Sequence, residues 1–401
     1  PVVIYAAGHA VDAMLATNVA DYMEFKSVEA LLWLETNDPE PLCLAKVPCT
    51  KNDVFTTPLL SPMDKRRLMK FLQLAMDFST QMVAAEQNPD SHTHSTTTNH
   101  CQPIPSDDLV KSLNERQLNQ GRSLPRPQNK PVSEKELNTL QDWMRKPNAT
   151  MEDYLCRQQH LSPKLRSIIR HALALETAEQ PASLQSSMTR LRSHLQALGR
   201  YGTTAFLLPM YGTGELSQAF TRSAAVFGTT YLLRRPPLGI LYQNTQSSTT
   251  VVEGIILQAE SGDQKPEPIK NLTRPKIIRS RQVVVPTNAV IHAKKGQSHR
   301  VLRRISVLNG NLVHGDQRHV FVLPPHCVTG HAHPIHGISM DSSLQVAPPG
   351  CTILHLTTLL ACTGDDTRQQ TTLDKAAQML LRENNGIAEV YVVTFSFMVE
   401  S

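Results

Sequence analysis

The sequence predicts a mixed α/β chain in which a helical domain is inserted between sheet-forming segments. Apolar residues recur with helical spacing in the first half of the chain, and short β-rich runs follow beyond Tyr201. The chain has 401 residues, of which 40% are hydrophobic, so a large core can form. The length favours two or three domains.

The predicted helices begin at capping residues followed by proline. Ser61-Pro62 and Ser162-Pro163 open two of them, and Gly199 ends a third. A further helix is expected at Leu373–Glu383. The apolar faces are formed by Leu68, Phe71, Leu72 and Ala75; by Leu165, Ile168, Ile169 and Ala172; and by Leu184, Met188, Leu191, Leu195 and Leu198.

The β-rich runs carry the alternating or continuous apolar residues that are typical of strands. They are Val251–Leu257, Gln282–Val285, Val301–Val307, His319–Leu323, Cys351–Thr358 and Val390–Met398. From about Glu86 to Thr150 polar residues and proline dominate, which predicts a disordered insertion containing a short helix at Ser133–Arg145. We therefore expect residues 1–60 in a sheet domain, 61–86 and 151–200 in a helical domain, 87–150 in the insertion, and 201–401 in the rest of the sheet domain.

Charge and cysteine usage exclude several classes of protein. The net charge of +5 is dispersed, which does not indicate nucleic-acid binding. The seven cysteines are odd in number and widely spaced, which favours reduced thiols and a cytosolic location. The sequence has no run of about 18 apolar residues that could span a membrane. It starts at Pro1 without an initiator methionine, so we expect part of a longer protein.

The segment Tyr211-Gly212-Thr213-Gly214-Glu215 is a glycine-rich turn that opens a helix. Such turns can hold the phosphates of a dinucleotide. Here Ser217 replaces the third glycine of that motif, and the Glu215 carboxylate would repel a pyrophosphate. The nucleotide interpretation is therefore disfavoured.

Glu215, Gln218 and Arg222 are spaced to share one face of this helix. An acid, an amide and a guanidinium together suit hydrogen bonding to a protein partner. The alternative is an internal network between Glu215 and Arg222 on a solvated helix, and spacing alone leaves both open.

The stretch Gly199–Leu216 resembles a diagnostic motif of the GDP-dissociation inhibitor and Rab escort superfamily. The resemblance implies a platform that binds GDP-bound Rab GTPases, with Glu215, Gln218 and Arg222 in the helix and with Tyr231 and Leu232 in a following strand. The implied fold is a GDI-like sheet domain, related to FAD- and NAD-binding folds, with an inserted helical domain. The N-terminal dinucleotide-fold unit and the end of the sheet domain are expected to be missing from this chain.

Two further regions are implied by the same resemblance. Arg200, Tyr201 and Gly202 resemble a mobile effector loop, for which the alternative is a plain helix-to-strand connection. The segment Val28–Phe55 resembles the region that holds the Rab C-terminus. Its candidate contacts are Leu31, Trp33 and Val47, for which ordinary core positions are the alternative.

Several segments resemble the escort branch, namely Tyr22–Val28, Val47–Phe55 and Lys65–Leu72. This implies a cytosolic, non-catalytic protein that presents Rab GTPases to the Rab geranylgeranyltransferase heterodimer, shelters the geranylgeranyl lipid between its helices and contacts membranes transiently. The apolar helix stripes have ordinary core as their alternative role. A GDP-dissociation inhibitor and a flavin- or NAD-dependent oxidoreductase of similar fold remain alternative functions.

Histidines and cysteines cluster in two loops, but neither cluster has the supported ligand spacing of a zinc site. They are His326, Cys327, His331, His333 and His336, and His92, His94, His100 and Cys101. No nucleophile, paired-carboxylate or phosphate-loop motif is present. We expect no metal, no cofactor and no catalytic residue.

Overall fold

The computed structural model describes residues 3–35, 43–86, 133–233, 235, 237–244, 250–257, 276–284, 298–312, 318–360, 366–382 and 387–400. They group into two compact units: residues 1–223 with 298–399, and residues 224–297 with 400–401. In the described part of the chain, no helix is both long and apolar enough to cross a bilayer.

The first unit is organised around a seven-stranded sheet with the strand order β13-β9-β12-β11-β10-β3-β4. β3 and β10 pair in parallel, with Leu31 opposite Val320, so two segments far apart in the sequence are neighbours in the sheet. The strands are β3 (Ala30–Glu35), β4 (Cys43–Lys46), β9 (Ser298–Asn309), β10 (His319–Leu323), β11 (Ile335–Asp341), β12 (Cys351–Leu359) and β13 (Ala388–Glu400). The strands predicted at Val301–Val307, His319–Leu323, Cys351–Thr358 and Val390–Met398 are confirmed.

One face of this sheet is covered by α10 (Asp366–Arg382), which contains most of the helix predicted at Leu373–Glu383. Alternate residues of β12 are buried, as a strand with one covered face requires. Leu354 and Leu356 of β12 share a core cluster with Leu373 and Leu380 of α10.

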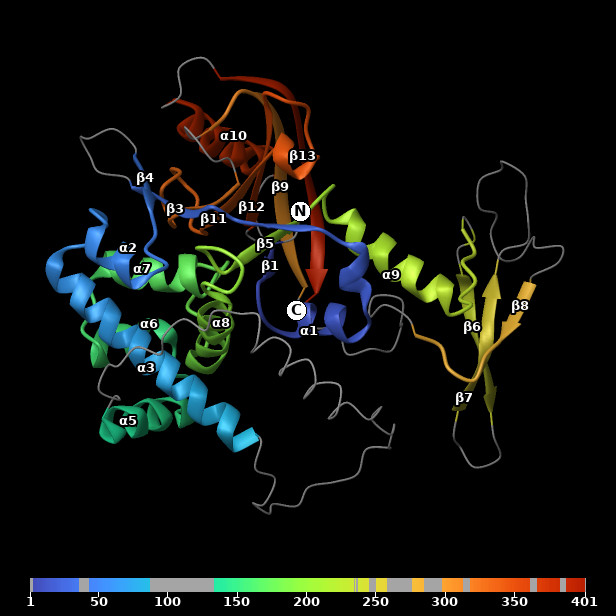
Figure 1. Ribbon diagram of the computed structural model, residues 1–401, viewed down its shortest axis with the longest axis horizontal. Helices are drawn as coiled ribbons and strands as arrows, with labels where there is room; N and C mark the ends of the chain where they lie inside the picture. Colours follow the sequence, from blue (N-terminus) through green and yellow to red (C-terminus); the bar gives the residue numbers. More distant parts are fainter. Residues whose placement is uncertain are drawn as a thin grey trace. The chain divides into compact units, whose positions relative to one another are not determined.

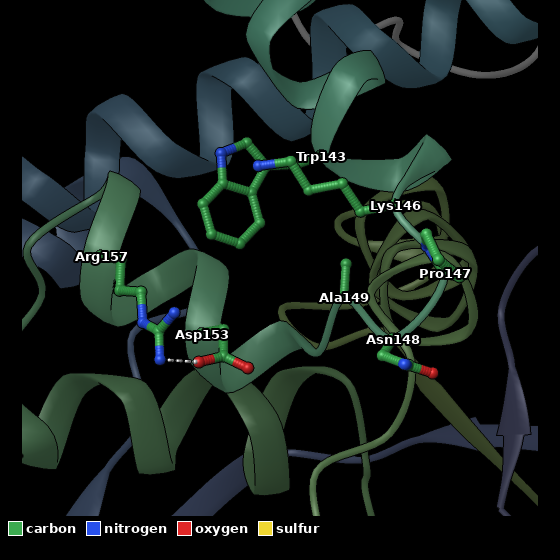
Figure 2. Close-up of a pocket in the computed structure, with 7 residues that line it drawn as sticks. All are labelled: Trp143, Lys146, Pro147, Asn148, Ala149, Asp153 and Arg157. Atoms are coloured by element: carbon green, nitrogen blue, oxygen red, sulfur yellow. Dashed lines mark ion pairs between the residues drawn. The ribbon is translucent and has the colours of Figure 1, made fainter.

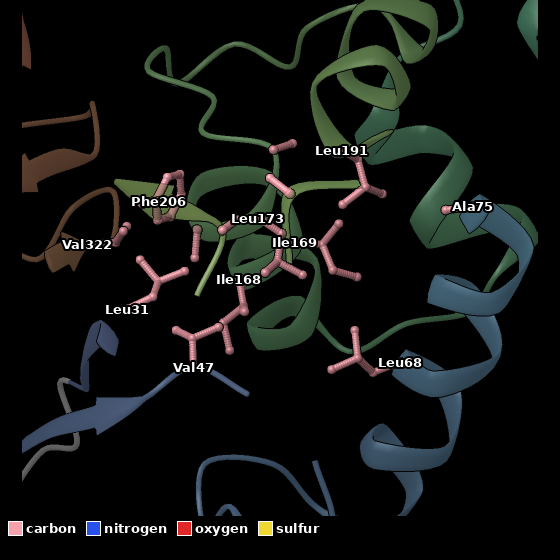
Figure 3. Packing of buried hydrophobic residues seen from close by; sticks show 14 of the residues in the cluster. Leu31, Val47, Leu68, Ala75, Ile168, Ile169, Leu173, Leu191, Phe206 and Val322 are labelled. Carbon is pink, nitrogen blue, oxygen red and sulfur yellow. The ribbon is translucent and has the colours of Figure 1, made fainter. Parts of the chain in front are cut away.

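The helical layer packs into a core that also contains residues of the sheet. Leu31 and Val322 of the sheet belong to the same buried cluster as Leu68, Ile168 and Leu191 of the helices (Figure 3). The layer contains α2 (Lys51–Thr56), α3 (Pro62–Glu86), α5 (Glu134–Arg145), α6 (Met151–Asp153), α7 (Pro163–Ile168) and α8 (Leu184–Ala197), with π-helical turns η2 (Tyr154–Gln158) and η3 (Ile169–Leu173). Figure 1 shows α3, α5 and α8 grouped beside the sheet.

The predicted helix boundaries at Ser61, Ser162 and Gly199 are confirmed. The Ser61 hydroxyl accepts a hydrogen bond from the Asp64 N–H at 3.1 Å, and the Ser162 hydroxyl accepts one from the Leu165 N–H at 3.4 Å. Gly199 follows α8 with a φ of 70°, a conformation that glycine adopts without strain.

The helix predicted at Ser133–Arg145 within the polar insertion is confirmed as α5. Leu137 and Leu140 are buried on one face of α5, and Glu136 pairs with Lys70 of α3 at 2.6 Å. This burial explains why the segment folds. Residues 87–132 lie outside the described residues.

A smaller three-stranded sheet, in the order β1-β5-β2, leads into the segment with the glycine-rich turn. Its centre is β5 (Phe206–Pro209), which pairs with β1 (Ile4–Tyr5) and β2 (Phe25–Ser27). α1 (His9–Ala16) and η1 (Val19–Tyr22) connect β1 to β2. After β5 the chain forms a turn and then enters α9 (Gly214–Val226).

The second unit contains an antiparallel sheet of β6 (Pro237–Asn244), β7 (Thr250–Leu257) and β8 (Lys276–Arg279). The strand predicted at Val251–Leu257 is confirmed. The strand predicted at Gln282–Val285 is wrong for its described residues, because β8 ends before them. A turn in which the Ser280 hydroxyl donates to the Gln282 carbonyl breaks the strand there, and Val285 lies outside the described residues.

Candidate functional site

Backbone hydrogen bonds fix the conformation of the turn before α9. Tyr211 and Gly212 have φ values of 60° and 94°. The Tyr211 N–H donates to the Leu344 carbonyl at 2.8 Å, and the Glu215 N–H donates to the Gly212 carbonyl at 3.2 Å. The Leu216 N–H donates to the Thr213 carbonyl at 3.2 Å. These N–H groups are therefore engaged within the protein, which favours the protein-surface interpretation over a phosphate cradle.

α9 has an inner face that packs and an outer face that carries the predicted polar residues. Ala219 is buried, and Leu216 packs on the small cluster that includes Ile4. Gln218 and Arg222 are exposed on the other side, whereas Glu215 is half-buried in the first turn. The helical spacing predicted from the sequence is confirmed for this helix.

Arg222 contacts an aromatic residue from near the start of the chain. Its guanidinium carbon lies 5.0 Å from the centre of the Tyr22 ring, and Tyr22 remains 38% exposed. Among the described residues no direct ion pair joins Glu215 to Arg222. Sequence reasoning missed Tyr22, because no local pattern connects it with Arg222.

Tyr231 and Leu232 belong to the second unit, separately from Glu215, Gln218 and Arg222. Each is 44% exposed. The strand expected at these two residues is wrong: they lie in an irregular segment, and β6 begins only at Pro237. Pro237 stands at the first position of β6, where the missing N–H group of proline is tolerated.

The predicted effector loop, Arg200 to Gly202, follows α8 and is anchored on its C-terminal side. The Thr204 hydroxyl donates to the Val28 carbonyl at 2.7 Å. Tyr201 is 54% exposed, and the Arg200 guanidinium carbon lies 6.0 Å from the centre of its ring. The loop thus presents an exposed aromatic residue beside a fixed point of attachment.

Gly202 is the point at which this loop passes closest to β2. A Cβ added at Gly202 would lie 2.5 Å from the Cβ of Ser27. Real carbon atoms do not approach this closely, so the contact requires glycine.

Leu31, Trp33 and Val47, the candidate contacts for a Rab C-terminus, are all core residues. Their exposed fractions are 0%, 4% and 0%. Figure 3 shows Leu31 and Val47 pointing toward Ile168 of the helical layer. This burial is that of ordinary core, which is the alternative role for these residues. Continuous apolar strands buried on both faces cannot be distinguished from binding residues by sequence alone.

The histidine cluster joins the sheet to the helical layer. The His336 Nε2–H donates to the His171 carbonyl at 3.0 Å, and His333 Nδ1 accepts from the Glu179 N–H at 3.1 Å. His331 Nε2 lies 2.8 Å from the Thr358 hydroxyl. Within the described ranges no group of three or more potential ligands could hold a metal ion. His92, His94, His100 and Cys101 lie outside those ranges.

Cys327, the thiol of this cluster, is half-buried, and its partial burial raises its pKa to about 12. At neutral pH it is therefore a protonated thiol, which is a poor metal ligand and a poor nucleophile. Its surroundings give it a packing role.

A hollow of about 250 Å³ lies between α5 and α6, lined by Trp143, Lys146, Pro147, Asn148, Ala149, Asp153 and Arg157 (Figure 2). Its charged groups already contact neighbours within the protein. The Lys146 Nζ lies 3.9 Å from the centre of a Trp143 ring, and Arg157 pairs with Asp153 at 3.2 Å. Both contacts lie within the protein, and no further feature of the hollow indicates a particular ligand.

Several known proteins are similar to this chain. The human protein named Rab proteins geranylgeranyltransferase component A 1 is 30% identical over 231 residues, which cover 58% of this chain and 25% of that protein. Rab escort protein 1 of Arabidopsis thaliana is 24% identical over 389 residues, which cover 91% of this chain and 57% of that protein. The chain thus spans only part of the length of these relatives.

The crystal structure of a Rab GDI from Plasmodium falciparum has the same fold, with a TM-score of 0.64 and 17% identity. The match covers 100% of this chain and 73% of that one. The family model described as GDP dissociation inhibitor matches residues 1–102 and 130–380, which is most of the chain. The chain therefore belongs to the GDP dissociation inhibitor family.

Proposed function

We propose that the chain is part of a Rab escort protein. In this role it binds newly made, GDP-bound Rab GTPases, presents them to a Rab geranylgeranyltransferase and shelters the attached lipid on the way to a membrane. Family membership supports Rab binding, and the names of the human and Arabidopsis relatives support the escort role. The chain itself would perform no catalysis, act in the cytosol and contact membranes only transiently.

The observation that carries the proposal is the outer face of α9. Gln218 and Arg222 are exposed there, and Arg222 is stacked on Tyr22. A guanidinium held on an aromatic ring is an effective hot-spot residue, because it is already partly ordered before a partner arrives. A preference for the GDP-bound partner would slow nucleotide release by stabilising that state.

Lipid sheltering would fall to the helical layer around α3, α7 and α8. Each buried CH₂ of a prenyl chain contributes roughly 0.8 kcal/mol, so a soluble carrier must provide a large apolar enclosure. The core of this layer is closed by its own side chains, among them Leu68 and Leu191 (Figure 3). Lipid entry therefore requires these helices to separate, and the same layer is the proposed docking region for the transferase.

A second candidate function is that of a GDP-dissociation inhibitor, which recycles prenylated Rab GTPases from membranes. The likeness to the Plasmodium Rab GDI structure favours it. The two functions differ in one measurable respect, since only an escort protein supports prenylation by the transferase. Reconstituted prenylation of a Rab with and without the full-length protein therefore distinguishes them.

Rab binding is tested by removing the polar face of α9. Glu215→Ala combined with Arg222→Ala in the full-length protein should weaken binding of a GDP-bound Rab by about 2 kcal/mol, roughly thirtyfold in Kd. Titration calorimetry gives the affinity, and circular dichroism checks that the fold is retained. Ser217→Ala, an exposed change on another side of the same helix, is the matched control. Unchanged affinity in the double variant would contradict the assignment.

A further inference from the structure

Basic residues outnumber acidic residues in the second unit, although they are dispersed along its sequence. Residues 224–297, which form most of this unit, contain ten lysines and arginines but four aspartates and glutamates, a formal charge of +6. The whole chain carries +5, so the remaining residues together carry −1. The positive charge of the chain therefore belongs to the second unit, where it favours an anionic partner.

The sheet of this unit contains a strand that extends beyond its neighbour on one side. β7 pairs with β6 from Thr250 to Leu257, whereas β8 pairs with β7 only from Gly254 onward. Just beyond β8, the Ser280 N–H donates to the Glu253 carbonyl at 2.9 Å. Among the residues that the structure describes, the first residues of β7 have no further strand on that side.

A hollow of about 530 Å³ lies beside this unpaired part of β7. The chain leaves the direction of β8 there, because the Ser280 hydroxyl donates to the Gln282 carbonyl in a turn. The backbone groups of an unpaired strand edge are a template for a further strand. The hollow is lined from both segments, by Val251, Val252 and Glu253 of β7 and by Arg279, Ser280 and Arg281 at and after the end of β8.

The charged groups of the hollow leave one cation without an acidic partner. Arg279 pairs with Glu253 at 3.4 Å, and Glu253 is the acidic member of the six lining residues. Arg281 is exposed, and within the described ranges no ion pair engages it. An acidic side chain placed in the hollow would therefore meet a guanidinium that can pair with it.

We propose that an acidic, extended peptide segment of another protein binds in this hollow as an additional strand beside β7. Its backbone would hydrogen-bond to the unpaired edge, and an acidic side chain would pair with Arg281. The free edge from Thr250 to Glu253 is four residues long, so it spans about 13 Å and can hold a short strand. The inference does not depend on Rab binding by α9.

Other anionic partners fit the hollow less well. No aromatic residue lines it, so a nucleic-acid base would find no stacking surface. A lipid headgroup does not supply the alternating N–H and C=O groups with which a strand edge pairs. Charge and backbone geometry together therefore select an acidic peptide.

Fluorescence anisotropy of the full chain with a labelled peptide tests the proposal. The probe is a short peptide in which glutamate alternates with valine, a pattern that suits an extended strand. It should bind, and binding should weaken as salt is added. The controls are a peptide with lysine in place of glutamate and a peptide whose backbone nitrogens are methylated at alternate positions, which removes donors that a strand needs. Each control should bind about tenfold more weakly.

Reversal of the charge at Arg281 tests the role of the hollow. Arg281→Glu should weaken binding of the glutamate peptide roughly tenfold and strengthen binding of the lysine peptide. Lys276→Glu is the matched control, because Lys276 is exposed but lies at the other end of β8, opposite Leu257. It should change either affinity by about twofold at most. Circular dichroism checks the fold, and Arg281→Gln is a milder variant that should also weaken binding of the glutamate peptide.

The proposal is overturned if the glutamate peptide does not bind, or if its methylated form binds equally well, since charge alone would then explain the attraction. Equal losses in Arg281→Glu and Lys276→Glu would assign binding to the overall charge of the unit and not to the hollow. Vesicles containing phosphatidylserine form the last arm. If Arg281→Glu abolishes sedimentation with these vesicles but leaves peptide binding unchanged, the hollow is a membrane contact and the proposal is wrong.

Discussion

The Arg222 guanidinium lies over the Tyr22 ring, 5.0 Å from its centre, and so links α9 to η1 across nearly the first half of the sequence. Tyr22 orders the guanidinium without neutralising it, because an aromatic face attracts a cation but carries no net charge. The outer face of α9 therefore depends on a residue that the helix itself does not contain.

Removing the Tyr22 ring should weaken Rab binding by about 1 kcal/mol, or roughly fivefold in Kd, through a less ordered Arg222. Tyr22→Ala should show this loss, and Tyr22→Phe should keep wild-type affinity, since the ring face is retained. Both affinities are measured by titration calorimetry with a GDP-bound Rab. In the Arg222→Ala background Tyr22→Ala should have no further effect; an additive loss would mean that Tyr22 acts independently of Arg222.

Gly202→Ala should destabilise the effector loop by about 1–3 kcal/mol, because the new methyl group would collide with Ser27. The added Cβ would lie 2.5 Å from the Ser27 Cβ and 2.7 Å from its Oγ. Ser27→Gly removes both atoms and should restore the stability lost in the Gly202→Ala variant. Urea unfolding of the single and double variants provides the measurement, and absence of rescue would show that the strain lies elsewhere.

The histidines between the sheet and the helical layer predict a loss of stability in acid. Burial lowers the pKa of His171 to about 4, whereas an unfolded histidine titrates at about 6.5. Between these values the unfolded state binds the additional proton. The contribution of His171 is therefore complete above about pH 6.5, and roughly 3 kcal/mol is lost as the pH falls toward 4.

His171→Asn tests this prediction, because asparagine does not titrate but keeps an N–H donor for the Glu176 carbonyl, which the His171 Nδ1–H reaches at 2.9 Å. Urea unfolding at about pH 7.5 and about pH 4.5 should show a smaller loss of stability in the variant. An equal loss in both proteins would assign the acid sensitivity to other groups.

Substitution of His194, in contrast, should increase the stability of the protein. The ring is fully buried beside Tyr5 and Phe206, and neither of its nitrogens has a hydrogen-bond partner among the residues that the structure describes. Burial also lowers its pKa to about 4. His194→Phe removes the unsatisfied polar atoms and should raise the free energy of unfolding by about 1 kcal/mol. Chemical denaturation of both proteins at neutral pH measures the change, and a loss of stability would indicate that the larger ring does not fit.

Local signals allowed much of the fold to be predicted. Caps at Ser61 and Ser162 and the apolar stripes of α3 and α8 are properties of short sequence windows, and all four appear in the structure. β3 was not predicted as a strand, because its continuous apolar run has no alternation to distinguish it from a buried helix. Its parallel partner β10 lies far from it in the sequence, so no short window of sequence reveals this pairing.

For the candidate site too, local features could be predicted from the sequence, whereas contacts between distant segments could not. The spacing of Glu215, Gln218 and Arg222 predicted their shared helix face, because helical geometry is local. The burial of Leu31 and the contact of Tyr22 with Arg222 could not be predicted, since both depend on which distant segments meet. Sequence reasoning thus located the helix that carries the polar face but not the residue that supports it.

The sheet and the helical layer share one hydrophobic core, and this limits how the chain can be divided into fragments. A fragment limited to residues 61–200 would expose to water the side chains that now pack against Leu31 and Val322. Such a piece should aggregate or lose its shape, so its failure to capture a partner would report misfolding and not a missing contact. Binding regions in this chain are therefore better mapped by single surface substitutions than by truncation.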